Sequence, residues 1–205
     1  MVIKQDFNET AKGILTKRVI KEIHSEDSEY IHSAVLIPIF KENGEYKVLL
    51  TKRTNIVEHH KGQVSFPGGV MDYEDDTFLD TALREAYEEI GLCREDVEIL
   101  GQVDDRLTLI TDFLIHPYVG VIPYPYSFRL NPREVERLVK VPLSVFIPGS
   151  GYGKTKSTVP GAENYEGITY SYKGDVIWGA TAGIMENLVE ILGEDSTRSF
   201  FCVTK

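Results

Sequence analysis

The fold is decided by residues 68–92, which read GGVMDYEDDTFLDTALREAYEEIGL. A glycine pair leads into an acidic loop, the loop leads into a predicted helix, and Gly91 ends that helix. At about 100° per residue, Glu89 lies about 40° to one side of Glu85 and Glu88 about 60° to the other. Small and apolar side chains occupy the opposite face. One face of the helix can therefore pack, while the other presents three carboxylates.

This crowding of carboxylates has two interpretations. Like charges four residues apart destabilise a helix slightly, and Arg84 can offset part of the repulsion by pairing with Glu88. Carboxylates are the hard oxygen ligands that Mg²⁺ or Mn²⁺ prefers, and the preceding Gly68-Gly69 allows the backbone to approach a ligand or an ion closely. The alternative is a solvated acidic helix face, which is what most charge runs are.

The second half of the stretch, from Arg84 to Leu92, resembles the Nudix box, G-x5-E-x7-R-E-U-x-E-E-x-G-U. The first half departs from that pattern. The span from Gly69 to Arg84 is one residue longer, and Asp75 or Asp76 stands in place of the early glutamate. The same departure is typical of one branch of the family, the coenzyme A pyrophosphatase-like Nudix hydrolases.

An upstream stretch strengthens the resemblance to this branch. Residues 49–69 are similar to its signature L-L-T-x-R-[SA]-x3-R-x3-G-x3-F-P-G-G, in register and without gaps. Thr54 replaces the small Ser or Ala, and Glu58 replaces the second arginine, which reverses a charge. Looser similarities extend the resemblance over residues 33–192. A single Nudix hydrolase domain over residues 1–205 is therefore expected.

The resemblance also implies a metal site and a mechanism. A divalent ion, Mg²⁺ or Mn²⁺, would neutralise the charge of a diphosphate and lower the pKa of a bound water. Arg84 would hold the glutamates in place. Glu88 or Glu89 could act as the general base, and Glu134 is a further candidate. The residues that the resemblance assigns to catalysis are Arg84, Glu85, Glu88 and Glu89, and those it assigns to the metal are Gly69, Glu85, Glu88 and Glu89.

Three residues are predicted to bind substrate, namely Arg53, His60 and Gly68. Arg53 is a candidate phosphate contact, and a surface salt bridge is its alternative. His60 falls where the branch often has a histidine, and a solvated loop histidine is the alternative. Trp178 is interpreted as a core residue rather than as a side chain that stacks on substrate.

The resemblance predicts an enzyme, a Nudix pyrophosphohydrolase that cleaves coenzyme A or acyl-CoA to 3′,5′-ADP and 4′-phosphopantetheine. The reversed charge at Glu58 keeps open other substrates, such as ADP-ribose, a nucleoside diphosphate sugar or a nucleoside triphosphate. A third hypothesis is a non-catalytic nucleotide-binding or regulatory module. The three intact glutamates argue against it, because a pure binder has no need to crowd carboxylates.

Composition narrows the classes of partner. The 205 residues carry a formal net charge of −10, with a pI of about 5.0. This acidity argues against nucleic acid and against an anionic membrane surface, so the expected partner is a small-molecule nucleotide. Cys93 and Cys202 make no disulfide framework. No apolar run approaches the roughly 20 residues of a membrane span, and the N-terminus lacks a signal-peptide stretch. A cytoplasmic location is expected, and the sequence leaves open whether the chain forms a homodimer.

The order of predicted elements indicates an α+β fold. The resemblance makes it a Nudix-like α/β/α sandwich, with a mixed β-sheet between helices and the box as a loop–helix–loop. The Asn43-Gly44 pair is a strong hairpin signal. Predicted strands are 33–40, 45–53, 64–66, 97–103, 112–122, 168–172 and 176–178. Besides the box helix, predicted helices are 131–140, with Asn131 as its N-cap, and 180–192, while residues 1–23 are expected to form a short helix and then a strand.

Overall fold

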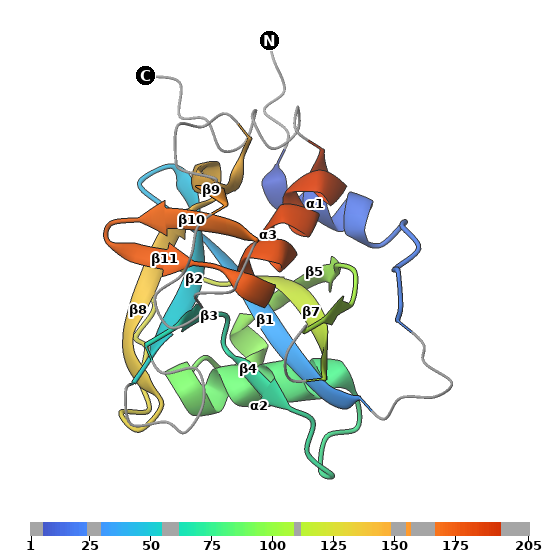
Figure 1. Cartoon of the computed structure of the whole chain (residues 1–205), viewed down its shortest axis with the longest axis vertical. Coiled ribbons are helices and arrows are strands. Elements are labelled where there is room, and N and C mark those ends of the chain that lie inside the picture. Colours follow the sequence, from blue (N-terminus) through green and yellow to red (C-terminus); the bar gives the residue numbers. More distant parts are fainter. Residues whose placement is uncertain are drawn as a thin grey trace.

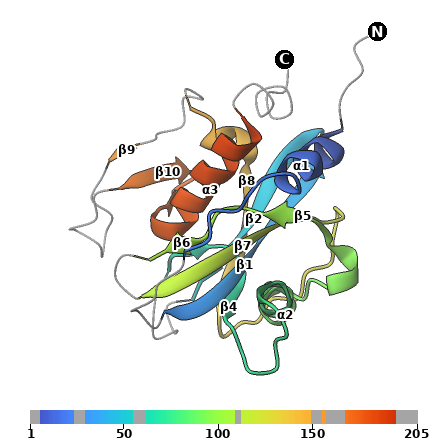
Figure 2. The same cartoon turned by 90° about the vertical axis from the view of Figure 1, so that its right-hand side faces the viewer.

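The structure is a computed structural model of the chain. It describes residues 6–23, 30–54, 62–108, 112–148, 155–156 and 167–193. Three helices flank a mixed sheet, with α2 on one face and α1 and α3 on the other (Figures 1 and 2). They are α1 (Phe7–Leu15), α2 (Phe78–Ile90) and α3 (Gly179–Leu192). The predicted α+β sandwich is confirmed.

The main sheet has eight strands, five of which follow the order β3-β2-β1-β7-β5. The central pair, β1 and β7, is parallel, and the other pairings are antiparallel. β4 also pairs with β1, β6 with β7 and β8 with β2. The strands are β1 (Ile31–Glu42), β2 (Glu45–Arg53), β3 (Val64–Ser65), β4 (Gly68–Val70), β5 (Glu98–Gln102), β6 (Arg106–Leu107), β7 (Phe113–Val121) and β8 (Val135–Pro142).

Strand β1 joins the two cores. Its side chains alternate between the sheet faces, so Leu36 and Phe40 pack under α2 while Ile37 and Ile39 pack under α1 and α3. All four are fully buried, which is why this segment reads as a continuous apolar run. The predicted hairpin to β2 is confirmed, with Asn43 and Gly44 at φ 53° and 83°.

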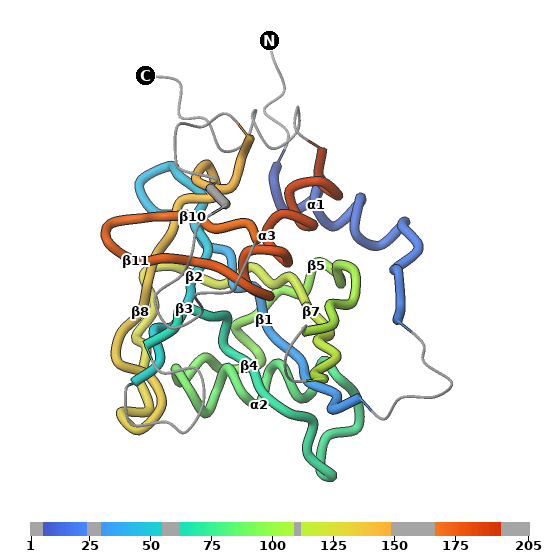
Figure 3. Tube along the Cα trace, viewed as in Figure 1, coloured from blue at the N-terminus to red at the C-terminus, as the bar shows by residue number. Residues whose placement is uncertain are grey.

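Helix α2 ends at Gly91, as predicted, and begins after Thr77, which was not predicted. The Thr77 side chain accepts a hydrogen bond from the Asp80 backbone amide at its start, and Gly91 ends it in the left-handed region at φ 68°. A Cβ on Gly91 would lie 2.9 Å from Cβ of Arg129. Figure 3 shows the chain passing from β3 through β4 and the acidic loop into this helix.

The predicted helix over residues 131–140 is wrong. Only a turn forms at Asn131, where Glu134 N–H donates to the Asn131 carbonyl, and the chain then enters β8. The apolar positions at 135, 138 and 139 suit a helix, but those at 139 and 141 suit a strand. Pairing with β2 decides between them, because β8 covers backbone groups along a β2 edge that would otherwise stay open.

The C-terminal part forms a second layer around a small sheet. β9 (Thr155–Lys156), β10 (Ile168–Tyr172) and β11 (Asp175–Ile177) pair antiparallel, so the predicted hairpin before α3 is confirmed. Asp175 fixes this layer to the main sheet, since its carboxylate accepts from Arg137 at 2.5 and 2.7 Å and from Lys52 at 3.3 Å.

Residues 16–23 form no strand, contrary to expectation. In the described parts of the chain, every helix is too short or too polar to cross a membrane.

Candidate active site

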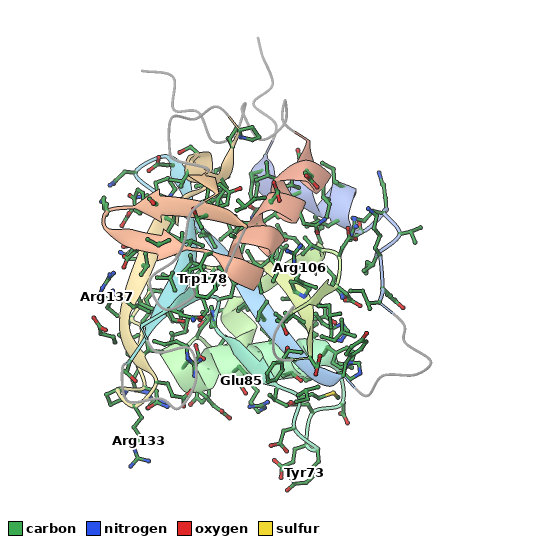
Figure 4. All side chains as sticks on the ribbon, viewed as in Figure 1. Tyr73, Glu85, Arg106, Arg133, Arg137 and Trp178 are labelled. Carbon is green, nitrogen blue, oxygen red and sulfur yellow. The ribbon has the colours of Figure 1, made fainter. Side chains whose placement is uncertain are left out.

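The glycine pair allows two close approaches. A Cβ on Gly68 would lie 2.4 Å from the Ala34 carbonyl oxygen, so this glycine lets β4 lie against β1. A Cβ on Gly69 would lie 2.5 Å from the Glu85 carboxylate. The Glu85 head group therefore occupies the space above the Gly69 backbone, and it points from α2 toward β4 (Figure 4).

Glu89 is the most deeply buried of the three box glutamates, at 2% exposure. Its Oε2 atom has no hydrogen-bond partner, and neither has Nε of Arg53. Nη1 of Arg53 lies 3.7 Å from Glu89 Oε1, which is beyond hydrogen-bond range. Burial raises the pKa of Glu89 to about 8; Glu85 and Glu134 add to this effect, while Arg53 and the Gly68 amide oppose it.

Glu85 is the second carboxylate inside the site. Burial raises its pKa, and the charges of Glu88 and Glu134 act in the same direction, while Arg84 opposes them. Nη1 of Arg84 donates to Glu85 at 2.7 Å. Burial and mutual repulsion disfavour the charged forms of these two neighbouring carboxylates, and a bound cation would offset that cost.

Arg84 is held by Asp75, one of the two aspartates that could stand in place of the early glutamate of the box. Nε and Nη2 of Arg84 donate to the two Asp75 oxygens at 3.0 and 2.9 Å. The Thr81 hydroxyl and the Asp72 amide also donate to Asp75. The hydrogen bonds from Arg84 are the largest cause that lowers the pKa of Asp75 to about 2.

Glu88 differs from the other two glutamates. Its side chain is 53% exposed and meets Arg84 at 3.4 Å, and Arg84 also donates to the Val70 carbonyl at 3.1 Å. Within the described ranges, no three acidic, His or Cys side chains already converge as a metal cage. The chemistry of Glu85 and Glu89 suits a hard divalent ion, and the unpartnered Glu89 oxygen supplies a free ligand atom.

The other predicted residues fall into three groups. Arg53 and Gly68 lie beside Glu89. His60 and Glu58 lie outside the described residues. Trp178 caps the start of α3 and is partly exposed rather than a core residue (Figure 4).

Sequence interpretation missed one contributor to this site. Asn131 was expected to cap a helix, but its backbone N–H donates to the Glu89 carbonyl at 2.9 Å, and its side chain donates to Glu134 at 2.9 Å. The Asn-Pro pair signals a turn, but nothing in the sequence shows that this turn meets the end of α2.

Comparison with known proteins agrees with the geometry. Residues 30–143 match the model of the NUDIX domain. The chain is 38% identical over 159 residues to the uncharacterized Nudix hydrolase NudL of Photorhabdus laumondii, covering 78% of this chain and 83% of the relative. It is 37% identical to NudL of Yersinia enterocolitica, covering 78% and 80%.

Solved structures share the fold. A NUDIX hydrolase from Alicyclobacillus acidocaldarius superposes with a TM-score of 0.55 at 17% identity, over 87% of this chain and all of that one. A MutT/nudix family protein from Enterococcus faecalis gives 0.55 at 12% identity, over 96% and 75%. The domain match and the NudL relatives show that this chain belongs to the Nudix hydrolase family.

Proposed function

We propose that the chain hydrolyses the diphosphate linkage of coenzyme A or acyl-CoA, with Mg²⁺ or Mn²⁺ bound at Glu85, Glu88 and Glu89. Membership of the family supports the general activity, that of a pyrophosphohydrolase that acts on a nucleotide derivative. Nudix enzymes generally use divalent metal ions, which agrees with the oxygen donors found here.

The observation that carries the proposal is the buried, unpartnered oxygen of Glu89. A buried carboxylate oxygen without a hydrogen bond is costly inside a protein, and a ligand that binds that oxygen removes the cost. Glu85 and the Gly69 backbone lie together beside it and offer further oxygen atoms. The side chains therefore fit a hard cation, which would supply charge neutralisation and an acidified water.

The remaining residues would position these groups. Arg84 reaches both Glu85 and Glu88 while Asp75 anchors it, so it limits where those carboxylates can go. Arg53 extends its guanidinium toward Glu89 from the end of β2 and keeps unsatisfied hydrogen-bond capacity at Nε. A substrate phosphate is the ligand that such a guanidinium binds well. Gly68 and His60 are assigned to substrate with it.

The coenzyme A assignment rests on residues 49–69, which resemble the upstream signature of that branch. Glu58 departs from the signature at a charged position, so ADP-ribose, a nucleoside diphosphate sugar and a nucleoside triphosphate belong in the same test.

Hydrolysis assays with Mg²⁺, Mn²⁺ or EDTA across these four substrate classes test the proposal. We expect turnover of coenzyme A that EDTA abolishes. Glu89→Gln should lower it by about 100-fold or more, since it removes a ligand charge while keeping the volume, and Glu95→Gln, an exposed match outside the site, should not. Turnover of ADP-ribose without coenzyme A would refute the substrate, and no turnover of any compound would favour the binding-module hypothesis.

A further inference from the structure

The segment from Asn131 to Glu134 is fastened on both sides of Glu89. Its first residue donates a backbone N–H to the carbonyl of Glu89, in the last turn of α2, at 2.9 Å. Its last residue accepts at its own carbonyl from the Thr54 amide, at 2.8 Å. Thr54 follows Arg53, the residue whose guanidinium faces Glu89. The segment therefore spans the buried carboxylate from helix to strand.

Side-chain contacts then fix the direction of Glu134. Nδ2 of Asn131 donates to Oε1 of Glu134 at 2.9 Å, while Oδ1 of Asn131 accepts from the Arg133 amide at 3.1 Å. Both ends of the asparagine amide are thus used, one for the turn and one for the carboxylate. The Arg133 side chain points away from Glu85 into solvent (Figure 4).

The held carboxylate faces the site. Glu134 is among the charges that raise the pKa of both Glu85 and Glu89, so its negative charge lies near both. Its Oε1 is occupied by Asn131, and among the described residues none donates to its Oε2. Glu134 is also partly exposed, which leaves that oxygen open to water.

The box glutamates are less suited to accept a proton from water. Glu85 is bound by Arg84 at 2.7 Å. Glu89 is enclosed at 2% exposure, and Glu88 is tied to Arg84 at the solvent side. Glu134 alone among these four is neither bound by Arg84 nor enclosed, and its second oxygen is open.

We propose that Asn131 is a positioning residue that holds Glu134 toward Glu85 and Glu89, and that Glu134 receives the proton of the attacking water. The inference rests on the proposed diphosphate hydrolysis. In that step the water oxygen forms a bond to phosphorus, one water proton passes to Oε2 of Glu134, and the bridging oxygen leaves with the electron pair of the broken P–O bond.

Two matched substitutions separate this role from a structural one. Glu134→Gln keeps an oxygen that accepts from Asn131 but removes the base. Asn131→Asp keeps the oxygen that accepts from the Arg133 amide but replaces the donor by a charged oxygen that repels Glu134. Glu136→Gln makes the same chemical change at an exposed position two residues away and serves as the control.

Steady-state kinetics should show kcat about 100-fold lower in Glu134→Gln and about 10-fold lower in Asn131→Asp. KM and Mn²⁺ affinity, followed by electron paramagnetic resonance, should stay within about threefold of the wild type, because neither side chain is a proposed ligand. In the Glu134→Gln background, Asn131→Asp should cost less than about twofold more. Added formate should restore turnover to Glu134→Ala.

The possible failures are distinct. A wild-type chain that hydrolyses none of the substrates overturns the proposed function and this inference with it. Wild-type turnover that survives Glu134→Gln overturns the inference alone. Multiplicative losses in the double variant refute positioning through Glu134, and a loss of Mn²⁺ affinity in Glu134→Gln makes that residue a ligand instead of a base.

Discussion

Replacing Glu89 by glutamine is expected to stabilise the metal-free protein at alkaline pH, although it should destroy activity. The side chain is 2% exposed, and burial raises its pKa from 4.5 to about 8. Glutamine has nearly the same volume and carries no charge, so it avoids the cost of enclosing a carboxylate.

The sign follows from proton binding. The folded chain keeps a proton on Glu89 between pH 4.5 and about 8, where the unfolded chain has lost it. The free energy of unfolding therefore falls as the pH rises through this window. At about 1.4 kcal/mol per pKa unit, ionisation of Glu89 lowers the free energy of unfolding by about 5 kcal/mol in full, and by about 3 kcal/mol at neutral pH.

Urea unfolding with EDTA present, at acid and alkaline pH, measures this difference. Wild type and Glu89→Gln should agree within about 1 kcal/mol near pH 5, and the variant should be more stable by about 4 kcal/mol near pH 9. Glu88→Gln is the control, because its side chain is 53% exposed and its charge stays solvated. If Glu89→Gln is no more stable than wild type near pH 9, the argument from burial is refuted.

Three other perturbations test neighbouring parts of the site. Asp75→Asn should cost about 2 kcal/mol of stability at neutral pH, measured by urea unfolding, because the wild-type pKa of about 2 marks a carboxylate stabilised by Arg84; the wild-type advantage should vanish as the pH falls through about 2. Gly69→Ala should lower turnover by about 100-fold while the circular dichroism spectrum stays unchanged, because its Cβ would lie 2.5 Å from the Glu85 carboxylate. Mn²⁺ affinity measured by calorimetry should fall about tenfold per pH unit below pH 8, because Glu89 must lose its proton to bind the ion; an affinity independent of pH would contradict this.

Local sequence signals predicted the parts of the fold that local interactions stabilise. The Asn43-Gly44 turn and the Gly91 end of α2 are both determined within a few residues of chain. Residues 135–140 were misassigned because the apolar spacing around them satisfies both periods, and the choice depends on β2, which lies roughly 80 to 95 positions upstream in the sequence. A distant hydrogen-bonding edge cannot be read from a local pattern.

Prediction of the site from the sequence is limited in the same way. The sequence identified Glu85, Glu88 and Glu89 as one group of three carboxylates on a helix face. The structure separates them by burial, from 2% exposure at Glu89 to a 53% exposed side chain at Glu88. That difference depends on how β4 and the 131–134 turn cover the helix, which the angular positions on a helical wheel do not contain.

Helix α2 places two kinds of carboxylate contact close together, and their contrast argues for the proposed roles. Asp75 meets Arg84 through two hydrogen bonds of 2.9 and 3.0 Å, and its pKa is lowered, as expected for an ion pair that stabilises the fold. Glu89 has Arg53 at 3.7 Å, an unpartnered oxygen and a raised pKa. A buried pair kept for stability would satisfy both partners. The chain satisfies one pair and leaves the other open, so the open carboxylate is the one arranged for a ligand.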